Sequence, residues 1–458
     1  MKRFAWIFTL LLIGAWGQPA AAQGLLGGLL SNLTQTLTNT VNTLLGQPQA
    51  VIVRTNLGLA GLQNVCLANG CTVVENLDEG ANQVFLVQPA QGLLPDVLAA
   101  VLRLVNGILD AEPDQLMLLP PNPQGALQTQ VPTYLYDQTP VNYFGATVWN
   151  GYANQPATNI TNVHKAQNTF HVTGSGIVAD IDTGVDPNHP ALKAILLPGY
   201  DFTRNQPGGS EMTDLEGSTG SACSTCQAAF VNQHTAAMLD QHTAAMLDGS
   251  PYAAFGHGTE VVGVIHLVAP TAHIMPLKAF RADGTGDLSD IIRAIYYAVQ
   301  NHVNVINMSF DLTTSSTELT NAINYASSHN VICVASSGND GKQEIVYPAG
   351  LKNVMGVAST NDFDQRSSFS NYGNQVVWVA APGENTVSTY PFGSYSVSSG
   401  TSFSSPLVAG TAALILNLKP GMNQSQAASA IAHAHWIGYN MGNGRLDVYA
   451  TLSSLQIW

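Results

Sequence analysis

Charged side chains are scarce in this sequence, and basic ones are the scarcest. Lys, Arg, Asp and Glu make up 10% of the 458 residues, against roughly 25% in ordinary globular domains. Fifteen Lys and Arg stand against 29 Asp and Glu, so the formal net charge is −14. Nucleic-acid binding requires clusters of Lys and Arg that neutralise phosphates, and we find none. We therefore expect no nucleic-acid partner.

Long apolar runs are absent beyond the N-terminus. The basic start Met1-Lys2-Arg3 precedes one apolar run from Phe4 to Trp16, and Ala20-Ala21-Ala22 fits a small-residue cleavage site. This pattern predicts a secretory signal peptide over residues 1–22, too short to span a bilayer. No later segment is expected to cross a membrane. We therefore expect a secreted, extracellular protein with no membrane contact after signal cleavage.

Cysteine is rare, with five residues in the chain. Cys66 and Cys71 form one close pair, and Cys223 and Cys226 form a second. In an exported protein, two short-range disulfides are the expected fate of such pairs. Cys333 lies alone in an apolar run and is expected to be a buried strand residue.

An eight-residue repeat follows the second cysteine pair. Residues 233–240 recur at once as residues 241–248. Eight residues advance a helix by about 80° past two full turns, so the two copies cannot share one buried face. We interpret residues 205–250 as a surface insertion. Zinc binding by its cysteines with His234 and His242 is an alternative, although the spacing is longer than usual and export favours disulfides.

The length favours two folded units. Residues 23–49 carry no charge and are interpreted as a spacer. A helical run at 97–104 lies among strand-like runs and predicts a small α+β domain, a split βαβ unit, over residues 50–120. The strand-like runs cover residues 51–55, 72–76, 83–87 and 115–119. Prolines end this unit abruptly, and residues 121–165 are interpreted as a linker and the start of the mature chain.

Strand and helix patterns alternate through the last unit, residues 166–458. The strand patterns cover residues 177–181, 273–279, 303–308 and 331–335, and the helical patterns cover residues 288–299 and 318–328. This alternation predicts an α/β fold with a doubly wound, mostly parallel sheet and helices on both faces. Ligands of such folds bind beyond the carboxyl ends of the strands.

Four polar residues fall at strand ends or helix starts of this predicted sheet. Asp182 ends a strand, His257 begins a helix between two glycines, and Asn339 follows another strand. Ser402 precedes an apolar helical run, where free N–H groups and the helix dipole favour negative charge. Singly, each has an ordinary role as a turn or capping residue. Together they predict a site in which a serine nucleophile attacks and main-chain donors hold an oxyanion.

The chain resembles the subtilisin-like serine peptidases, the subtilases. Four blocks carry the resemblance: Asp182-Thr183-Gly184, His257-Gly258-Thr259, Gly338-Asn339 and Gly400-Thr401-Ser402-Phe403-Ser404-Ser405-Pro406. The order Asp, His, Ser is that of subtilisin and differs from the orders of chymotrypsin and the α/β-hydrolases. The match is colinear from about residue 174 to 450.

The resemblance implies a monomeric serine endopeptidase that acts on proteins and peptides. Ser402 is expected to attack the peptide carbonyl, His257 to move the proton, and Asp182 to orient the histidine. The Ser402 N–H and the Asn339 side chain are expected to hold the oxyanion.

The resemblance also implies an extended substrate strand between two segments. The expected substrate-binding residues are Gly284, Thr285, Gly286, Ser309, Phe310, Asp311, Gly338 and Val346. Asp311 and Val346 stand where subtilisins commonly have glycine at the S1 pocket. We hypothesise an altered, shallower S1 pocket that disfavours large aromatic side chains. Glu260 stands where relatives usually carry a second histidine.

Residues 50–119 are similar to the inhibitory propeptide of the family, which implies self-cleavage between about residues 120 and 150. The released unit is expected to act as an intramolecular inhibitor. No cofactor is required and no metal ligand is assigned, and a structural calcium ion is left open. Asp201 matches a calcium-ligand position of some relatives, but its loop partners are missing, and the usual calcium loop after the histidine block is absent too.

Two other functions use the same fold. One is a catalytically silent binding protein, and the other is a transacylase or peptide cyclase, because amine acceptors and water react with the same acyl-enzyme. An aspartic peptidase requires two carboxylates that share a proton, and no second Asp-Thr-Gly or Asp-Ser-Gly motif occurs.

Overall fold

The computed structural model describes residues 49–119, 136–215 and 252–456. Within these ranges the chain forms two compact units. The first contains residues 49–74 and 86–115, and the second contains residues 75–85 and everything described from residue 116 onward. The predicted signal peptide, the spacer up to residue 48, and the cysteine pair and repeat of the predicted insertion lie outside the described residues. The first part of that insertion, residues 205–215, is described, and it contains the buried Glu211.

The first unit is built on a four-stranded sheet in the order β2-β3-β1-β4. The strands are β1 (Val51–Thr55), β2 (Cys71–Asn76), β3 (Val84–Pro89) and β4 (Ile108–Pro113), and the helices are α3 (Gly58–Asn69) and α4 (Pro95–Leu102). A disulfide joins Cys66 to Cys71, as the spacing predicted. The apolar residues of β1 are buried in the core of this unit.

The fourth strand of this sheet differs from the prediction. It is β4, not residues 115–119, and β4 pairs antiparallel with β1. Asp110 and Glu112 lie within β4 and hide its apolar pattern, because a carboxylate in a strand breaks the alternation that marks a half-buried strand. Residues 116–118 form β5 (Leu116–Leu118), which pairs with β12 (Thr285–Asp287) in the second unit.

The second unit is built on an eight-stranded sheet, in the order β10-β9-β11-β8-β13-β14-β15-β16. The strands are β8 (Ile177–Asp182), β9 (Tyr200–Asp201), β10 (Gln206–Pro207), β11 (His273–Lys278), β13 (Val305–Met308), β14 (Ile332–Ser336), β15 (Met355–Thr360) and β16 (Val379–Pro382). Only the β9–β10 pair is antiparallel within this sheet. The predicted α/β fold with a mostly parallel sheet is confirmed.

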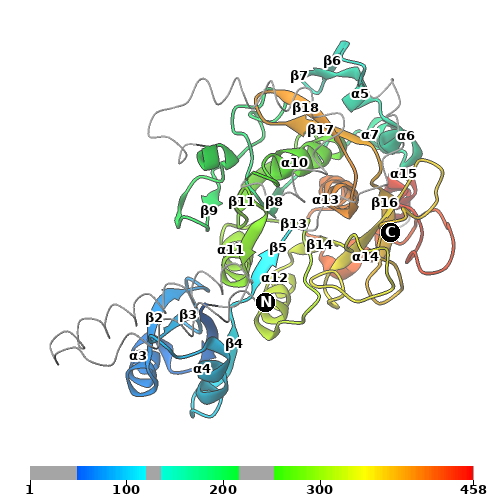
Figure 1. Ribbon diagram of the computed structural model, residues 1–458. Coiled ribbons are helices and arrows are strands. Elements are labelled where there is room, and N and C mark those ends of the chain that lie inside the picture. Colours follow the sequence, from blue (N-terminus) through cyan, green and yellow to red (C-terminus); the bar gives the residue numbers. More distant parts are fainter. Residues whose placement is uncertain (1–48, 120–135, 216–251, 457–458) are drawn as a thin grey trace, which may run out of the picture. The chain divides into compact units, whose positions relative to one another are not determined.

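Two pairs of helices pack against this sheet (Figure 1). The first pair, α10 (His257–Val268) and α13 (Thr401–Leu418), shares one apolar core with alternate strand residues such as Val178 and Ile332. The second pair, α11 (Leu288–Gln300) and α12 (Thr317–Ser328), contacts β8 and β14. The intervening strand residues, among them buried Cys333, lie outside that core, as the two-residue period of a strand requires.

Regular structure also covers residues 140–170, most of which the sequence assigned to a linker and the start of the mature chain. This stretch contains β6 (Pro140–Tyr143), β7 (Ala146–Trp149), α5 (Asn150–Ala153), α6 (Pro156–Ile160) and α7 (Val163–Phe170). Its elements are too short for periodicity to reveal, and buried Tyr152 anchors them by donating to the Gly263 carbonyl of α10. The remaining elements are the 3₁₀ turn Glu211–Leu215, β17 (Thr386–Tyr390), β18 (Ser394–Ser398), α14 (Gln424–Ile431) and α15 (Val448–Ser454).

Helix α13 corrects the expectation that no long apolar run follows the N-terminus. It is long and apolar enough, by length and composition alone, to cross a bilayer. However, 89% of its apolar window is buried inside the protein. It is therefore the core helix of a folded unit, in which an all-round apolar surface is required by burial on every side.

Candidate active site

The central strand β8 carries Asp182 as its last residue, at the carboxyl end of the sheet. His257 opens α10 next to it. The histidine Nδ1 lies 2.8 Å from Asp182 Oδ1 and 2.9 Å from Oδ2. A carboxylate only accepts hydrogen bonds, so Nδ1 carries the ring proton and Nε2 is the basic nitrogen. Both side chains are buried, which keeps water from weakening the contact.

The glycines on either side of His257 have separate structural reasons. Gly256 has φ of 96°, a conformation that side-chain-bearing residues rarely adopt. At Gly258, an added Cβ would lie 2.1 Å from the Gly184 carbonyl oxygen. Only glycine lets the start of α10 approach the loop after Asp182 this closely.

Ser402 lies in the first turn of α13 and is 1% exposed. Its hydroxyl donates to the Ser309 carbonyl at 3.2 Å. His257 Nε2 is buried and has no hydrogen-bond partner among the described residues. The imidazole ring of His257 contacts Phe403, the residue after Ser402, edge-on, with 5.9 Å between the ring centroids. The structure thus brings His257 to the first turn of the helix that bears Ser402, without the expected hydrogen bond between the two side chains. In enzymes this bond often tightens only once substrate is bound.

Asn339, predicted as an oxyanion donor, lies in the loop after β14 and contacts the start of α13. Its Oδ1 accepts from the Thr401 N–H at 2.9 Å and from the Thr401 hydroxyl at 2.8 Å. These two bonds hold the amide beside the residue that precedes Ser402. Because the oxygen accepts these two bonds, the nitrogen is the end of this side chain that can donate a hydrogen bond to an oxyanion.

Burial and Asp182 act in opposite directions on His257. Burial opposes the charged imidazolium, but the adjacent Asp182 carboxylate outweighs it and raises the pKa of His257 above its ordinary value. Asp180, two residues earlier on β8, is also buried. Burial, and to a lesser extent the nearby Asp182 charge, raise the pKa of Asp180 well above its usual range, which favours the neutral form of this carboxyl.

Glu211 is a buried residue of the site that the sequence did not reveal. Its carboxyl group accepts from the Thr259 hydroxyl and, at 2.7 Å, from the Gly256 N–H. The Thr183 hydroxyl donates to it at 3.3 Å. Glu211 thereby joins the loop after Asp182 to the first turn of α10. Its local sequence resembles that of any surface acid, and only the three-dimensional contacts identify it.

Lys278, on β11 opposite Asp182, provides a fully buried positive charge. Its Nζ donates to the Thr183 carbonyl at 2.8 Å and to Asp214 Oδ2 at 2.8 Å. A buried ammonium is stable only when it is paired and hydrogen-bonded, and these partners meet that requirement. The cation also lowers the cost of keeping several carboxyl groups near the histidine.

The two predicted substrate segments belong to different elements. Gly284 precedes β12, which contains Thr285 and Gly286, while Ser309 and Phe310 follow β13 and are buried. Ser309 hydroxyl donates to the Ser402 carbonyl at 3.1 Å, which ties the second segment to the nucleophile helix. The structure thus brings this segment to Ser402.

The S1 hypothesis rests on Asp311 and Val346, and Gly338 is a third predicted substrate-binding residue beside Asp311. Val346 is fully buried. A Cβ added to Gly338 would lie 3.2 Å from Asp311 Oδ2, so these two residues are close neighbours. Burial, with smaller contributions from Asp340 and Glu344, raises the pKa of Asp311 to about 7. The altered S1 pocket stays a prediction.

Asp311→Asn is expected to stabilise the fold at pH 8 and to have little effect at pH 4. The folded-state pKa of about 7 exceeds the ordinary value of 3.8. As pH rises between these values, the unfolded chain releases a proton that the folded chain retains, so stability falls. The upper bound on the gain is about 4 kcal/mol. Thermal unfolding of the Ser402→Ala protein, which cannot digest itself, with and without Asp311→Asn measures it. An equal shift at both pH values would contradict the assignment.

Glu260, the unexplained departure from relatives, receives a structural reason. It is buried on α10, and its Oε1 accepts from the hydroxyls of Ser396 and Ser398 on β18. The Ser388 hydroxyl of β17 donates to its main-chain carbonyl. Glu260 therefore anchors the β17–β18 hairpin to the histidine helix.

Asp201 does not fit a calcium site. Its carboxylate accepts from the Thr203 hydroxyl at 2.6 Å and from Arg204 Nη1 at 2.9 Å. A carboxylate already paired with a guanidinium is a poor ligand for a second cation. Among the described residues, no group of three or more His, Cys, Asp or Glu side chains is placed to hold a metal ion.

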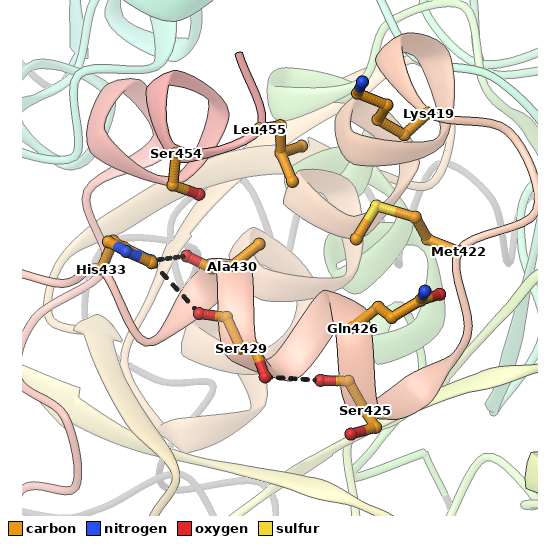
Figure 2. A pocket seen from close by; sticks show the side chains of 9 residues that line it. All are labelled: Lys419, Met422, Ser425, Gln426, Ser429, Ala430, His433, Ser454 and Leu455. Atoms are coloured by element: carbon orange, nitrogen blue, oxygen red, sulfur yellow. Dashed lines mark hydrogen bonds between the residues drawn. The ribbon is translucent and has the colours of Figure 1, made fainter. Parts of the chain in front are cut away.

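A pocket of about 490 Å³ lies away from these residues (Figure 2). It is formed by α14, α15 and the end of α13, and none of its lining residues belongs to the Asp182–His257–Ser402 set. Its single histidine, His433, follows α14, and its Nδ1 lies 3.2 Å from the Ser429 and Ala430 carbonyls of that helix. This cavity is therefore not part of the candidate active site.

The parallel sheet carries an aspartate, a histidine and a serine in this order along the chain. Comparison with known protein families identifies the class of protein that this arrangement defines. Residues 174–449 match the subtilase family, Peptidase_S8. The chain belongs to this family. It is 33% identical over 302 residues to a thermophilic serine proteinase of Bacillus sp. strain AK1. It is also 33% identical over 282 residues to thermitase of Thermoactinomyces vulgaris.

The coverage of these relatives differs. The match covers 66% of this chain and 65% of the Bacillus proteinase, against 60% of this chain and 88% of thermitase. For a thermostable alkaline protease of Halalkalibacterium halodurans, 37% identical, the match covers 38% of this chain and 51% of the relative.

Solved structures support the fold. Fervidolysin from Fervidobacterium pennivorans, described as a keratinolytic enzyme related to subtilisin, matches 89% of this chain and 61% of its own, with TM-score 0.66 and 21% identity. A lanthipeptide protease matches 66% of this chain and 93% of its own, with TM-score 0.52 and 24% identity. At these identities the likeness establishes the subtilisin-like fold alone.

Proposed function

We propose that the protein is a secreted serine endopeptidase that hydrolyses proteins and peptides through an acyl-enzyme on Ser402. The observation that carries the proposal is the buried His257–Asp182 pair, 2.8 Å from Nδ1 to Oδ1, beside the helix start that bears Ser402. Membership of the subtilase family supports the same chemistry.

The mechanism follows from the placement of each group. His257 Nε2 removes the Ser402 proton as the hydroxyl attacks the substrate carbonyl, and later gives it to the leaving amine. Asp182 holds the Nδ1 proton and stabilises the imidazolium that forms. The oxyanion is held by the Ser402 N–H and the Asn339 amide nitrogen. No cofactor enters these steps. We expect the protein to act as a monomer on protein and peptide substrates.

Labelling with a fluorophosphonate tests the nucleophile. We expect one modified residue, Ser402, identified by mass spectrometry, and no labelling of Ser402→Ala. Casein hydrolysis on the same samples separates the alternatives. Labelling without hydrolysis would favour a transacylase, which an added amine acceptor detects as a ligated product. No labelling and no hydrolysis would favour a silent binding protein.

Asn339→Ala is expected to lower kcat by about 10²–10³-fold with little change in KM, since the lost donor acts on the oxyanion and not on the ground state. This range is the one known for the equivalent donor in subtilisin itself. Steady-state kinetics on a peptide substrate measures it. Thr401→Ser, which keeps the hydroxyl that donates to Asn339, is the matched control and should stay near wild type. A change confined to KM would remove Asn339 from the oxyanion role.

We further propose that export uses the signal peptide over residues 1–22 and that maturation cuts between about residues 120 and 150. The unit over residues 50–119 then acts as an intramolecular inhibitor. N-terminal sequencing of secreted wild type and Ser402→Ala tests both steps. Loss of the second cut in Ser402→Ala supports self-processing, whereas equal processing would assign the cut to another protease.

A further inference from the structure

A buried asparagine outside the predicted site, Asn371, is bonded to the loop that carries Asn339. This loop follows β14 and covers residues 337–342, and we call it the Asn339 loop. Asn371 belongs to the connection between β15 and β16 and is fully buried. The sequence gave no reason to single it out, because the contact joins segments about 30 residues apart in the chain.

Asn371 holds the Asn339 loop on both sides of the predicted oxyanion donor. On the N-terminal side, its backbone N–H donates to the Gly338 carbonyl at 3.0 Å. On the C-terminal side, its Oδ1 accepts from the backbone N–H groups of Asp340 at 3.1 Å and Lys342 at 3.0 Å. Three main-chain groups of one short loop therefore bond to a single residue.

These bonds fix the orientation of the Asn371 amide. Two backbone N–H groups face its Oδ1, and an amide nitrogen carries only donors, so turning the amide over would place donors against donors. In the observed orientation, Asn371 Nδ2 is buried and has no hydrogen-bond partner among the described residues. A buried donor without a partner is destabilising. The bonds to Oδ1 therefore hold the amide in place against that cost.

Gly338 allows this close approach. Its φ of 92° lies in the region that side-chain-bearing residues rarely adopt. A Cβ added to Gly338 would lie 2.4 Å from Asn371 Nδ2. Asn371 thus packs directly against the backbone of the residue that precedes Asn339.

The Asn339 amide is restrained at a second point by α13. Its Oδ1 accepts from the N–H and the hydroxyl of Thr401, whereas Asn371 restrains the backbone on either side. The two restraints together determine where the Asn339 amide nitrogen points. Such precision matters, because an oxyanion donor must lie about 2.7–3.1 Å from the developing charge. A misplacement of about 1 Å can cost 10²-fold in rate.

We propose that Asn371 is a positioning residue for the oxyanion donor. It holds the backbone before and after Asn339, so that the Asn339 amide nitrogen is directed at the reacting carbonyl. Asn371 acts through Asn339 and does not itself contact the substrate. The inference rests on the proposed peptidase function and on the oxyanion role of Asn339 within it.

A double-mutant cycle tests the proposal. Asn371→Leu removes the acceptor and keeps a side chain of similar size. We expect it to lower kcat by about 10–100-fold with little change in KM. In the Asn339→Ala background the same substitution should cost less than about 3-fold, because the donor that it misplaces is already gone. Steady-state kinetics on one peptide substrate measures all four proteins.

Three further variants serve as controls. Asn361→Leu is the matched one, since Asn361 Oδ1 also accepts from two backbone N–H groups, those of Phe363 at 2.9 Å and Gln365 at 3.0 Å, in the loop after β15. It should stay near wild type. Asn371→Asp keeps the acceptor and should lie closer to wild type than Asn371→Leu. Asn371→Ala gives a second cycle if the leucine variant does not fold, as unfolding midpoints in the Ser402→Ala background show.

The outcomes separate the two proposals. Losses that multiply in the double variant would overturn the positioning role, as would an unchanged kcat in a folded Asn371→Leu protein. A loss in Asn371→Asp as large as that in Asn371→Leu would also overturn it, because the acceptor is retained there. If wild type does not hydrolyse the peptide at all, the proposed peptidase function itself is refuted.

Discussion

Replacing Ser402 by alanine is expected to lower kcat for peptide hydrolysis by about 10⁶-fold, the scale found for the nucleophile of subtilisin, another member of this family. The loss is this large because the acyl-enzyme forms on the Ser402 hydroxyl. The Ser309 hydroxyl, in the segment next to it, is already bonded to the Ser402 carbonyl and to Ser405 Oγ. Progress curves at high enzyme concentration measure the residual rate.

His257→Ala is expected to cost about as much as Ser402→Ala, and the double variant no more than either alone. The two groups act as one unit, so removing the base leaves the nucleophile unactivated. A double variant whose losses multiply would show that the residues act independently. Unfolding midpoints of all three variants control for damage to the fold, since both residues are buried.

Asp182→Asn is expected to lower kcat by about 10⁴-fold. Asparagine keeps the size of the side chain but can donate to Nδ1, which favours the tautomer with its proton on Nε2. The pH profile provides a second readout. Asp182 raises the pKa of His257 against the effect of burial. The basic form required for catalysis exists above that pKa, so removing the carboxylate should move the acid limb of kcat/KM to lower pH.

Asp180→Asn is the matched control for Asp182→Asn. Both aspartates are buried residues of β8, two positions apart, so they lie on the same side of the strand. Burial and the charge of Asp182 raise the pKa of Asp180 and so favour its neutral form, and its Oδ1 accepts from Asn307 Nδ2 at 2.9 Å. A neutral carboxyl resembles an amide in size and charge. We expect Asp180→Asn to change kcat less than 10-fold on these grounds, and a loss near 10⁴-fold would disprove the distinction.

The fold and the placement of four site residues were accessible from sequence because they depend on local patterns. Apolar runs with strand and helix periods gave the order of elements, and Asp182, His257, Asn339 and Ser402 stand at the ends of those elements. In a parallel sheet these ends meet at one edge, so positions along the chain convert directly into proximity. The disulfide of Cys66 followed from short spacing in the same way.

What could not be predicted depends on contacts between distant segments. Glu211 is recognised only through its bonds to Gly256 and Thr259. β5 shows an ordinary strand pattern, but its partner strand is β12. The paired residues Leu118 and Thr285 are 167 positions apart in the sequence. The acids of β4 concealed a strand. The hydrogen bond from the Ser402 hydroxyl to the Ser309 carbonyl depends on the side-chain rotamer of Ser402, which sequence spacing does not predict.

The position of Ser402 on α13 links turnover to heat resistance. Every residue from Thr401 to Leu416 is buried, and the helix shares its apolar core with residues of β8, β11, β13, β14, β15 and β16. A nucleophile on such an element has no loop to flex independently of the interior. Thermal inactivation of this protein should therefore coincide with unfolding of the whole second unit. Substitutions that loosen the core to speed product release should also shorten the half-life of the folded protein at high temperature.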